Sequence, residues 1–108
     1  MNLTEADEIY QAMQTTKWTS LVDDLVRTAV RYARLRTDWA LASTEEQREM
    51  NDVRTRAHTA VIDCCNILSR NMGAAGEDIT WRVKLGEDRK VIGDFACCLH
   101  CLLGLHAR

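Results

Sequence analysis

The sequence predicts an all-α protein with a single domain over residues 1–108: an antiparallel bundle of three long helices, a short N-terminal helix and a short irregular or helical segment at 77–86. Its length suits one domain, because a second hydrophobic core would have too few residues to fill it. The chain has no proline, five glycines, three tryptophans, two tyrosines and one phenylalanine, so residues that favour turns and strands are scarce. Apolar residues also recur every three or four positions, which is the helical period.

Two helices are expected in the first part of the chain. Thr4 can cap a short helix, in which Ile9 and Met13 lie one turn apart on a single face. The second helix begins at Thr19 or Ser20 and continues to about Leu41. Its apolar stripe consists of residues spaced by three and four: Trp18, Leu21, Val22, Leu25, Ala29, Tyr32 and Ala33.

The third helix has a recognisable start and stop. Ser43 and Glu46 have the spacing of a capping box, in which each side chain binds the other residue's backbone amide. The helix is expected to end at Met72, because Gly73 can supply the left-handed conformation that often follows a helix. Its apolar stripe is Met50, Val53, Ala57, Val61, Cys64 and Leu68.

The segment 77–86 admits two interpretations. Residues Ile79, Trp81, Val83 and Leu85 alternate as in a strand, yet Asp78 can cap a two-turn helix that Gly86 ends. We favour the helix, since a lone hairpin would have no sheet to join in a helical chain.

The last helix, from about residue 87 to 106, is apolar on all sides between Val91 and Leu105 except at Asp94 and His100. Such a helix must be covered on more than one side. Either it lies at the centre of the bundle, or a second subunit covers one of its faces. The short chain has little other mass to cover it, and we therefore predict a homodimer.

Charge and targeting signals restrict the location and the partners. Fourteen basic against sixteen acidic residues give a net charge of −2, which disfavours binding to the nucleic-acid backbone. The acidic start does not have the pattern of a signal peptide, and the run 91–105 is too short and too polar to span a bilayer. We expect a cytoplasmic protein with no membrane partner, in which the five cysteines are reduced.

The cysteines and one histidine form the first candidate site. Residues Cys97, Cys98, His100 and Cys101 place four soft-metal ligands within five positions, and Cys64 would join them if the third and last helices pack antiparallel. A zinc site is therefore possible. The favoured interpretation is packing, because free cysteines are commonly buried as small hydrophobic residues, and no cofactor is expected.

Asp94 is the second candidate, because a carboxylate in a buried helix is costly unless it is paired. Arg70, Arg82 and Arg89 flank the connection nearest to it. The favoured interpretation is an ion pair that fixes the register of the helices. The alternative is a pocket for a small anionic ligand, made by Asp94 together with Arg82, Arg89, His58 and Trp81, with Arg70 nearby.

The sequence does not match either of two motifs of helical enzymes in full. Glu46-Gln47-Arg48-Glu49 resembles the first half of the acidic motif of MazG-like nucleotide pyrophosphohydrolases, which hold magnesium between two helices. The second half is missing, because Glu77 is followed three positions later by Thr80, and Glu87 by Lys90. The Arg–His motif of the HEPN ribonucleases is not matched by Arg54 and His58, which are too close in sequence. We predict no catalytic residue.

The segments Asn66–Met72, Asp78–Arg82, Leu85–Lys90 and Ile92–Cys97 resemble a family of small uncharacterised bacterial proteins with a domain of unknown function. The resemblance covers residues 44–108 and implies a bacterial helical protein, without an activity.

The function expected is that of a non-enzymatic interaction or regulatory module. It would bind a protein partner around Trp81, Arg82 and Arg89, or through an uncovered side of the bundle. The alternatives are a metal- or small-ligand-binding bundle that uses Asp94 and the cysteines, and the pyrophosphohydrolase.

Overall fold

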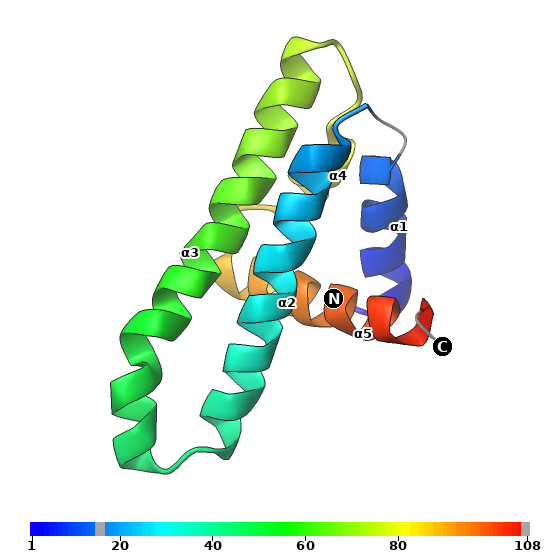
Figure 1. Ribbon diagram of the computed structural model, residues 1–108. Helices are drawn as coiled ribbons and strands as arrows, with labels where there is room; N and C mark the ends of the chain where they lie inside the picture. The colour runs from blue at the N-terminus through cyan, green and yellow to red at the C-terminus, as the bar shows by residue number, and fades with distance from the viewer. Residues whose placement is uncertain (15–16, 107–108) are drawn as a thin grey trace.

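The structure is a computed structural model that describes residues 1–14 and 17–106, and in this part of the chain it consists of helices without strands. The helices are α1 (Leu3–Gln14), α2 (Thr19–Leu41), α3 (Thr44–Ala74), α4 (Thr80–Leu85) and α5 (Arg89–His106) (Figure 1). The predicted all-α class is confirmed. No helix in the described residues is long and apolar enough to cross a membrane.

Helices α2 and α3 form a long antiparallel hairpin (Figure 1). The predicted capping box at its turn is confirmed: the Glu46 amide donates to Ser43 Oγ at 3.2 Å, and the Ser43 amide donates to Glu46 Oε1 at 3.1 Å. The predicted stop at Gly73 is wrong. Helix α3 continues to Ala74, and the residue with positive φ is Gly76, whose φ is 76°. The Glu77 amide then donates to the Met72 carbonyl at 2.9 Å, which satisfies an end carbonyl of the helix.

The segment 77–86 contains helix α4, as the favoured interpretation predicted. The N-cap residue is Ile79 instead of the predicted Asp78, whose carboxylate accepts hydrogen bonds from the Thr80 amide at 2.8 Å and from the Thr80 hydroxyl at 2.5 Å. Gly86, with a φ of 67°, ends it in the left-handed region.

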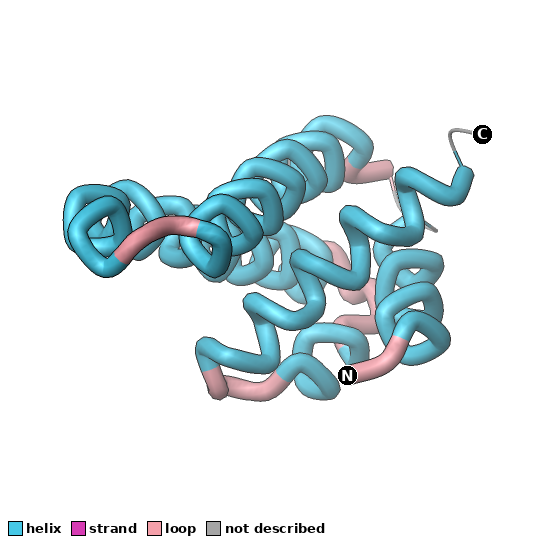
Figure 2. The backbone as a smooth tube through the Cα atoms, turned by 90° about the horizontal axis from the view of Figure 1, so that it is seen from below, coloured by secondary structure: helices cyan, strands magenta, loops and turns pink. Residues whose placement is uncertain are grey.

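The prediction that the last helix packs antiparallel to the third is wrong. Arg89 is the first residue of α5, and it contacts His58 and Thr59 in the middle of α3, roughly four turns before the end of that helix. Helix α5 therefore crosses the hairpin instead of running alongside it (Figures 1 and 2). The cause is the connection 75–88, which carries the chain back along α3 before α5 begins.

Helix α5 is the centre of the fold, because it packs against each of the other four helices. Its residues Ile92, Phe95, Ala96 and Leu99 are almost completely buried. This favours the first of the two explanations given for its apolar sequence. On α3 the predicted core residue Cys64 is only half-buried, and Cys65 takes the core position instead.

The molecule is elongated, with principal extents of 47 × 30 × 22 Å and a radius of gyration of 14.2 Å. A compact domain of about 100 residues has a radius near 13 Å. The difference arises from the end of the hairpin at residues 37–53, which extends beyond α5 and α1 (Figure 1). We call these residues the arm. Arg54 follows directly after the arm, and its guanidinium lies 4.4 Å from the centre of the Trp39 ring, which joins the two helices.

Candidate functional site

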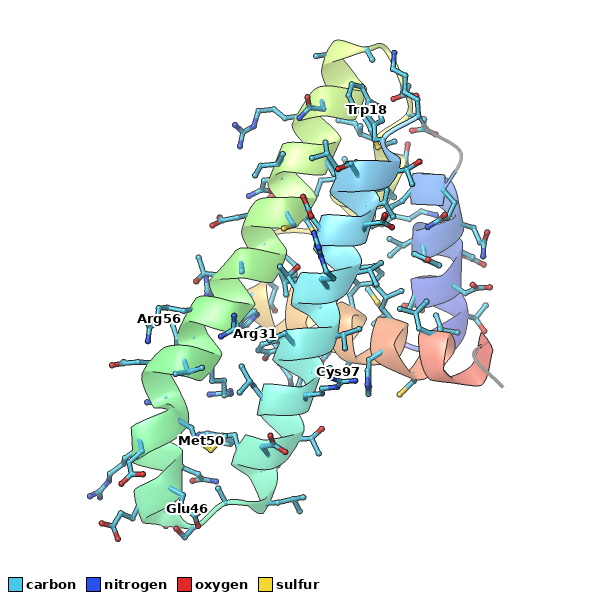
Figure 3. All side chains as sticks on the ribbon, in the orientation of Figure 1. Trp18, Arg31, Glu46, Met50, Arg56 and Cys97 are labelled. Atoms are coloured by element: carbon cyan, nitrogen blue, oxygen red, sulfur yellow. The ribbon has the colours of Figure 1, made fainter. Side chains whose placement is uncertain are left out.

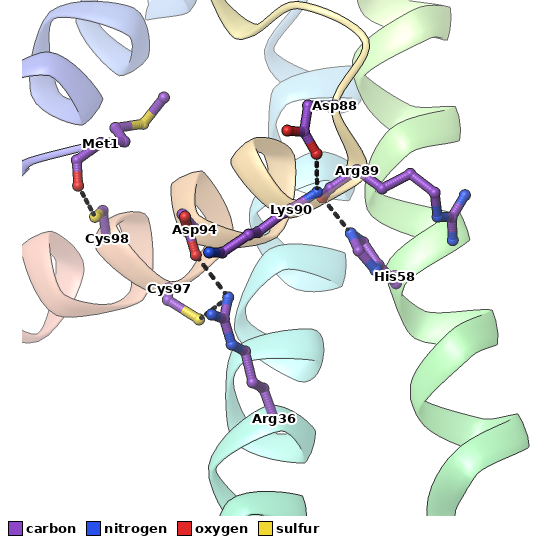
Figure 4. Close-up of polar contacts among 9 residues, drawn as sticks. All are labelled: Met1, Arg36, His58, Asp88, Arg89, Lys90, Asp94, Cys97 and Cys98. Carbon is purple, nitrogen blue, oxygen red and sulfur yellow. Dashed lines mark hydrogen bonds and ion pairs between the residues drawn. The ribbon is translucent and has the colours of Figure 1, made fainter.

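Asp94 forms an ion pair across the contact between α2 and α5 (Figure 4). Its Oδ1 lies 3.0 Å from Nη1 of Arg36, and the same nitrogen lies 3.7 Å from Sγ of Cys97. The side chains of Arg36 and Asp94 are 35% and 29% exposed. The pair is therefore partly screened by solvent, and it fixes the crossing of the two helices more than it stabilises the fold.

The partner of Asp94 differs from those that the sequence suggested. Arg70 is exposed on α3, Arg82 is buried at α4, and Arg89 donates to the Thr59 hydroxyl at 3.2 Å. Arg36 was missed, although the sequence contains a signal for it. It follows Tyr32 by four positions and so continues the buried stripe of α2.

An open cavity of about 490 Å³ surrounds this ion pair at the angle between the arm and α5. We call it the elbow. Arg36 and Asp94 supply its charged groups, and most of the other lining side chains are small or apolar. The lining residues are Met1, Arg36, Thr37, Ala40, Leu41, Asp94, Cys97 and Cys98.

His58 lies at a separate junction, where α2, α3 and α5 meet. Its ring stacks on Tyr32 with centroids 4.6 Å apart, and its Nε2 lies 2.6 Å from the carbonyl oxygen of Arg89, which accepts the hydrogen bond (Figure 4). Burial lowers the pKa of His58, and the nearby guanidinium groups lower it further, although the hydrogen bond to Arg89 opposes them. His58 is thus a neutral hydrogen-bond donor that holds the start of α5.

Arg82 is buried and connects three segments. It donates to Asn66 Oδ1 at 3.0 Å and to the Gly86 carbonyl at 2.8 Å, and its Nη2 lies 3.4 Å from a carboxylate oxygen of Glu87. Through these hydrogen bonds the guanidinium holds the end of α4 against α3. Arg82 is therefore placed as a structural residue.

Trp81 is 2% exposed and lines a different cavity, of about 510 Å³, between α1 and α4. The pocket expected from Asp94, Arg82, Arg89, His58 and Trp81 is not assembled, because these side chains make their contacts at three different places in the fold. Of the three residues around which an interaction surface was expected, Trp81 and Arg82 are buried and Arg89 is exposed.

The cysteines lie on two helices. Cys65 is buried, which raises its pKa to about 12, and burial also raises the pKa of Cys97 and Cys98. Cys64, Cys97, Cys98 and His100 are half-buried, while Cys101 is exposed. In residues 1–14 and 17–106, no three His, Cys, Asp or Glu side chains are grouped so that they could hold a metal ion. The zinc site stays a prediction for which the described residues provide no preformed geometry.

The acidic pair of the pyrophosphohydrolase pattern lies at the start of α3. Glu46 is used by the capping box, and the hydrogen bonds from Ser43 lower its pKa. The same carboxylate therefore has a structural role that explains its presence in the first turn.

No family model, curated protein or solved structure matches the chain. The resemblance of residues 44–108 to a family of small bacterial proteins stays a prediction.

Proposed function

We propose that the protein is a non-enzymatic interaction module that works as a homodimer, and that the elbow is its dimer interface. The observation that carries the proposal is the exposure of Leu41, which is 83% accessible and lines the elbow beside the half-buried face of α5. A large apolar side chain that is exposed beside other apolar groups is typical of an interaction site.

The elbow combines the two parts of the molecule that the single chain leaves uncovered. One wall is the arm, with Thr37, Ala40 and Leu41, and the other is the outer face of α5, with Cys97 and Cys98. The ion pair between Arg36 and Asp94 fixes the angle between these walls. The short side chains of Ala40 and the cysteines leave room for a partner to approach.

A second copy of the chain suits this shape. The arm protrudes beside a hollow of its own molecule, so a two-fold axis would place each arm in the elbow of the other subunit. The same surface patch of each subunit would then be buried at the interface, which is the arrangement found in symmetric dimers. The interface would also cover the half-buried side chains of Cys97 and Cys98 on the outer face of α5.

Light scattering coupled to size-exclusion chromatography, at micromolar concentration, tests the proposal. The wild-type protein is expected to have the mass of a dimer, and Leu41→Arg the mass of a monomer, because a charge would be buried without a partner. Val83→Arg is the matched control. Val83 is also a large apolar side chain, 74% exposed, but it lies on α4 and outside the elbow, so this variant should stay dimeric.

A monomeric wild-type protein would contradict the proposal. So would a dimer that Leu41→Arg leaves intact, because the interface would then lie elsewhere. Circular dichroism of both variants establishes that they are folded.

A further inference from the structure

A second surface lies on the opposite side of the hairpin. Helix α5 crosses behind α2 and α3, so the other face of the groove between them is not covered by another helix in the described residues (Figure 1). A hollow of about 300 Å³ lies in this groove, lined by Thr28 and Arg31 of α2 and by Val53, Arg56, Ala57 and Ala60 of α3. Three of these side chains, those of Thr28, Ala57 and Ala60, are short.

Two guanidinium groups border this hollow. Arg31 and Arg56 are exposed, and neither forms an ion pair with a carboxylate in residues 1–14 and 17–106. Arg31 and Arg56 lie at about the same level of the hairpin (Figure 3). A guanidinium presents two parallel N–H groups, which fit the two oxygens of a carboxylate.

The surface continues across α2. A second hollow, of about 470 Å³, shares Arg31 and adds Arg27 and Arg34 to the apolar side chains of Val26, Val30 and Leu35. The whole face therefore combines half-buried aliphatic groups with guanidinium groups, of which Arg27 is paired with Asp24. An amphipathic helix with carboxylates beside its apolar stripe matches both features.

We propose that this face of the α2–α3 hairpin binds an acidic amphipathic helix of a partner protein, whose carboxylates pair with Arg31 and Arg56. A nucleic acid matches the face less well. Its phosphates could pair with the arginines, but its backbone has no apolar stripe to cover Val26, Val30 and Leu35.

The experiment uses a fluorescent synthetic peptide in which Leu follows a helical spacing and Glu occupies the flanking positions. Fluorescence anisotropy should show saturable binding to the wild-type protein and none for the same peptide with Lys in place of Glu. The double variant Arg31→Glu, Arg56→Glu should bind at least about tenfold more weakly, because both charge pairs become repulsive. Both residues are exposed, and circular dichroism should show an unchanged fold.

The matched control is Arg48→Glu, Arg70→Glu, which makes the same change in the net charge of the protein, with both substitutions on α3. Both residues are exposed and neither lines the groove, so the affinity should stay within about twofold of the wild-type value. Leu41→Arg should also bind the peptide normally, which separates this surface from the elbow.

Three results would overturn the proposal: no binding of the acidic peptide, equal weakening by both double variants, or tighter binding of a short DNA duplex that Arg31→Glu, Arg56→Glu abolishes. The last result would identify a nucleic-acid surface instead.

Discussion

Gly93 allows three helices to meet at one point. A Cβ atom at this position would lie 3.0 Å from the Tyr32 hydroxyl oxygen, 3.2 Å from Tyr32 Cε2 and 3.3 Å from His58 Nε2. These atoms belong to aromatic rings stacked on each other, so they have little freedom to move away. The absence of a side chain at Gly93 is therefore needed for α5 to approach α2 and α3 closely.

We expect Gly93→Ala to lower the free energy of unfolding by about 1–3 kcal/mol, because the added methyl group overpacks this junction. Gly104→Ala is the control in the same helix. Nothing lies within 4 Å of a Cβ atom there, so this variant should be more stable by up to about 1 kcal/mol through its helix propensity. Urea denaturation measures both. An equal increase in the free energy of unfolding of both variants would show that the junction at Gly93 is packed less tightly than described.

His58 should make the stability depend on pH. Its pKa is lower in the folded protein than in the unfolded chain, mainly because of burial, so the unfolded state binds the proton more tightly. Its contribution is complete above about pH 6.5 and is lost as the pH falls from there through the folded-state pKa. We expect His58→Gln, which retains a donor for the Arg89 carbonyl, to weaken the loss of stability between about pH 7.5 and pH 5.5. Unfolding curves across this range would contradict the assignment if the two proteins lost stability in parallel.

At the scale of helices, Arg82 joins α4 to α3. Arg82→Met keeps much of the apolar volume but leaves Asn66 Oδ1 and the Gly86 carbonyl without their buried donor. We expect a loss of about 2–3 kcal/mol in the free energy of unfolding.

Lys84→Met, on the same helix, changes an exposed side chain and should remain within about 0.5 kcal/mol of the wild type. Chemical denaturation compares the two. If the loss in Arg82→Met were no larger than that in Lys84→Met, the buried hydrogen bonds of Arg82 would contribute little.

The helices themselves could be predicted from the sequence, because their signals are local. The period of the apolar residues, the box at Ser43 and Glu46, and the glycine after Leu85 each act within a few residues. The direction of α5 could not, since it depends on where Arg89 meets α3, a contact between residues far apart in the chain.

The candidate site was predictable only in part. Asp94 was expected to pair with an arginine, but the choice among the arginines depends on the crossing of α5. Similarly, a spacing of three or four from Val61 allows either Cys64 or Cys65 in the core, and only the rotation of α3 against its neighbours decides between them.

For the whole molecule, a dimer through the elbow would link stability to protein concentration. The midpoint of thermal unfolding should rise as the protein concentration rises, because association stabilises the folded chain by mass action. In Leu41→Arg the midpoint should not depend on concentration. Scanning calorimetry over about a hundredfold range of protein concentration measures the midpoint. A wild-type midpoint that stays constant would contradict a dimer formed by folded subunits.

The arm has a consequence for motion. Residues 37–53 comprise the end of α2, the turn and the start of α3, which contact each other without a third layer, whereas the rest of the hairpin is held by α5 at Gly93 and His58. A segment with few tertiary contacts opens at a lower free energy than the core. Amide hydrogens in the arm should therefore exchange with solvent faster than those of residues 57–72. When a partner binds, the amides of the arm should be the first to exchange more slowly. The arm can therefore open locally while the crossing of α5 with α2 and α3 stays folded.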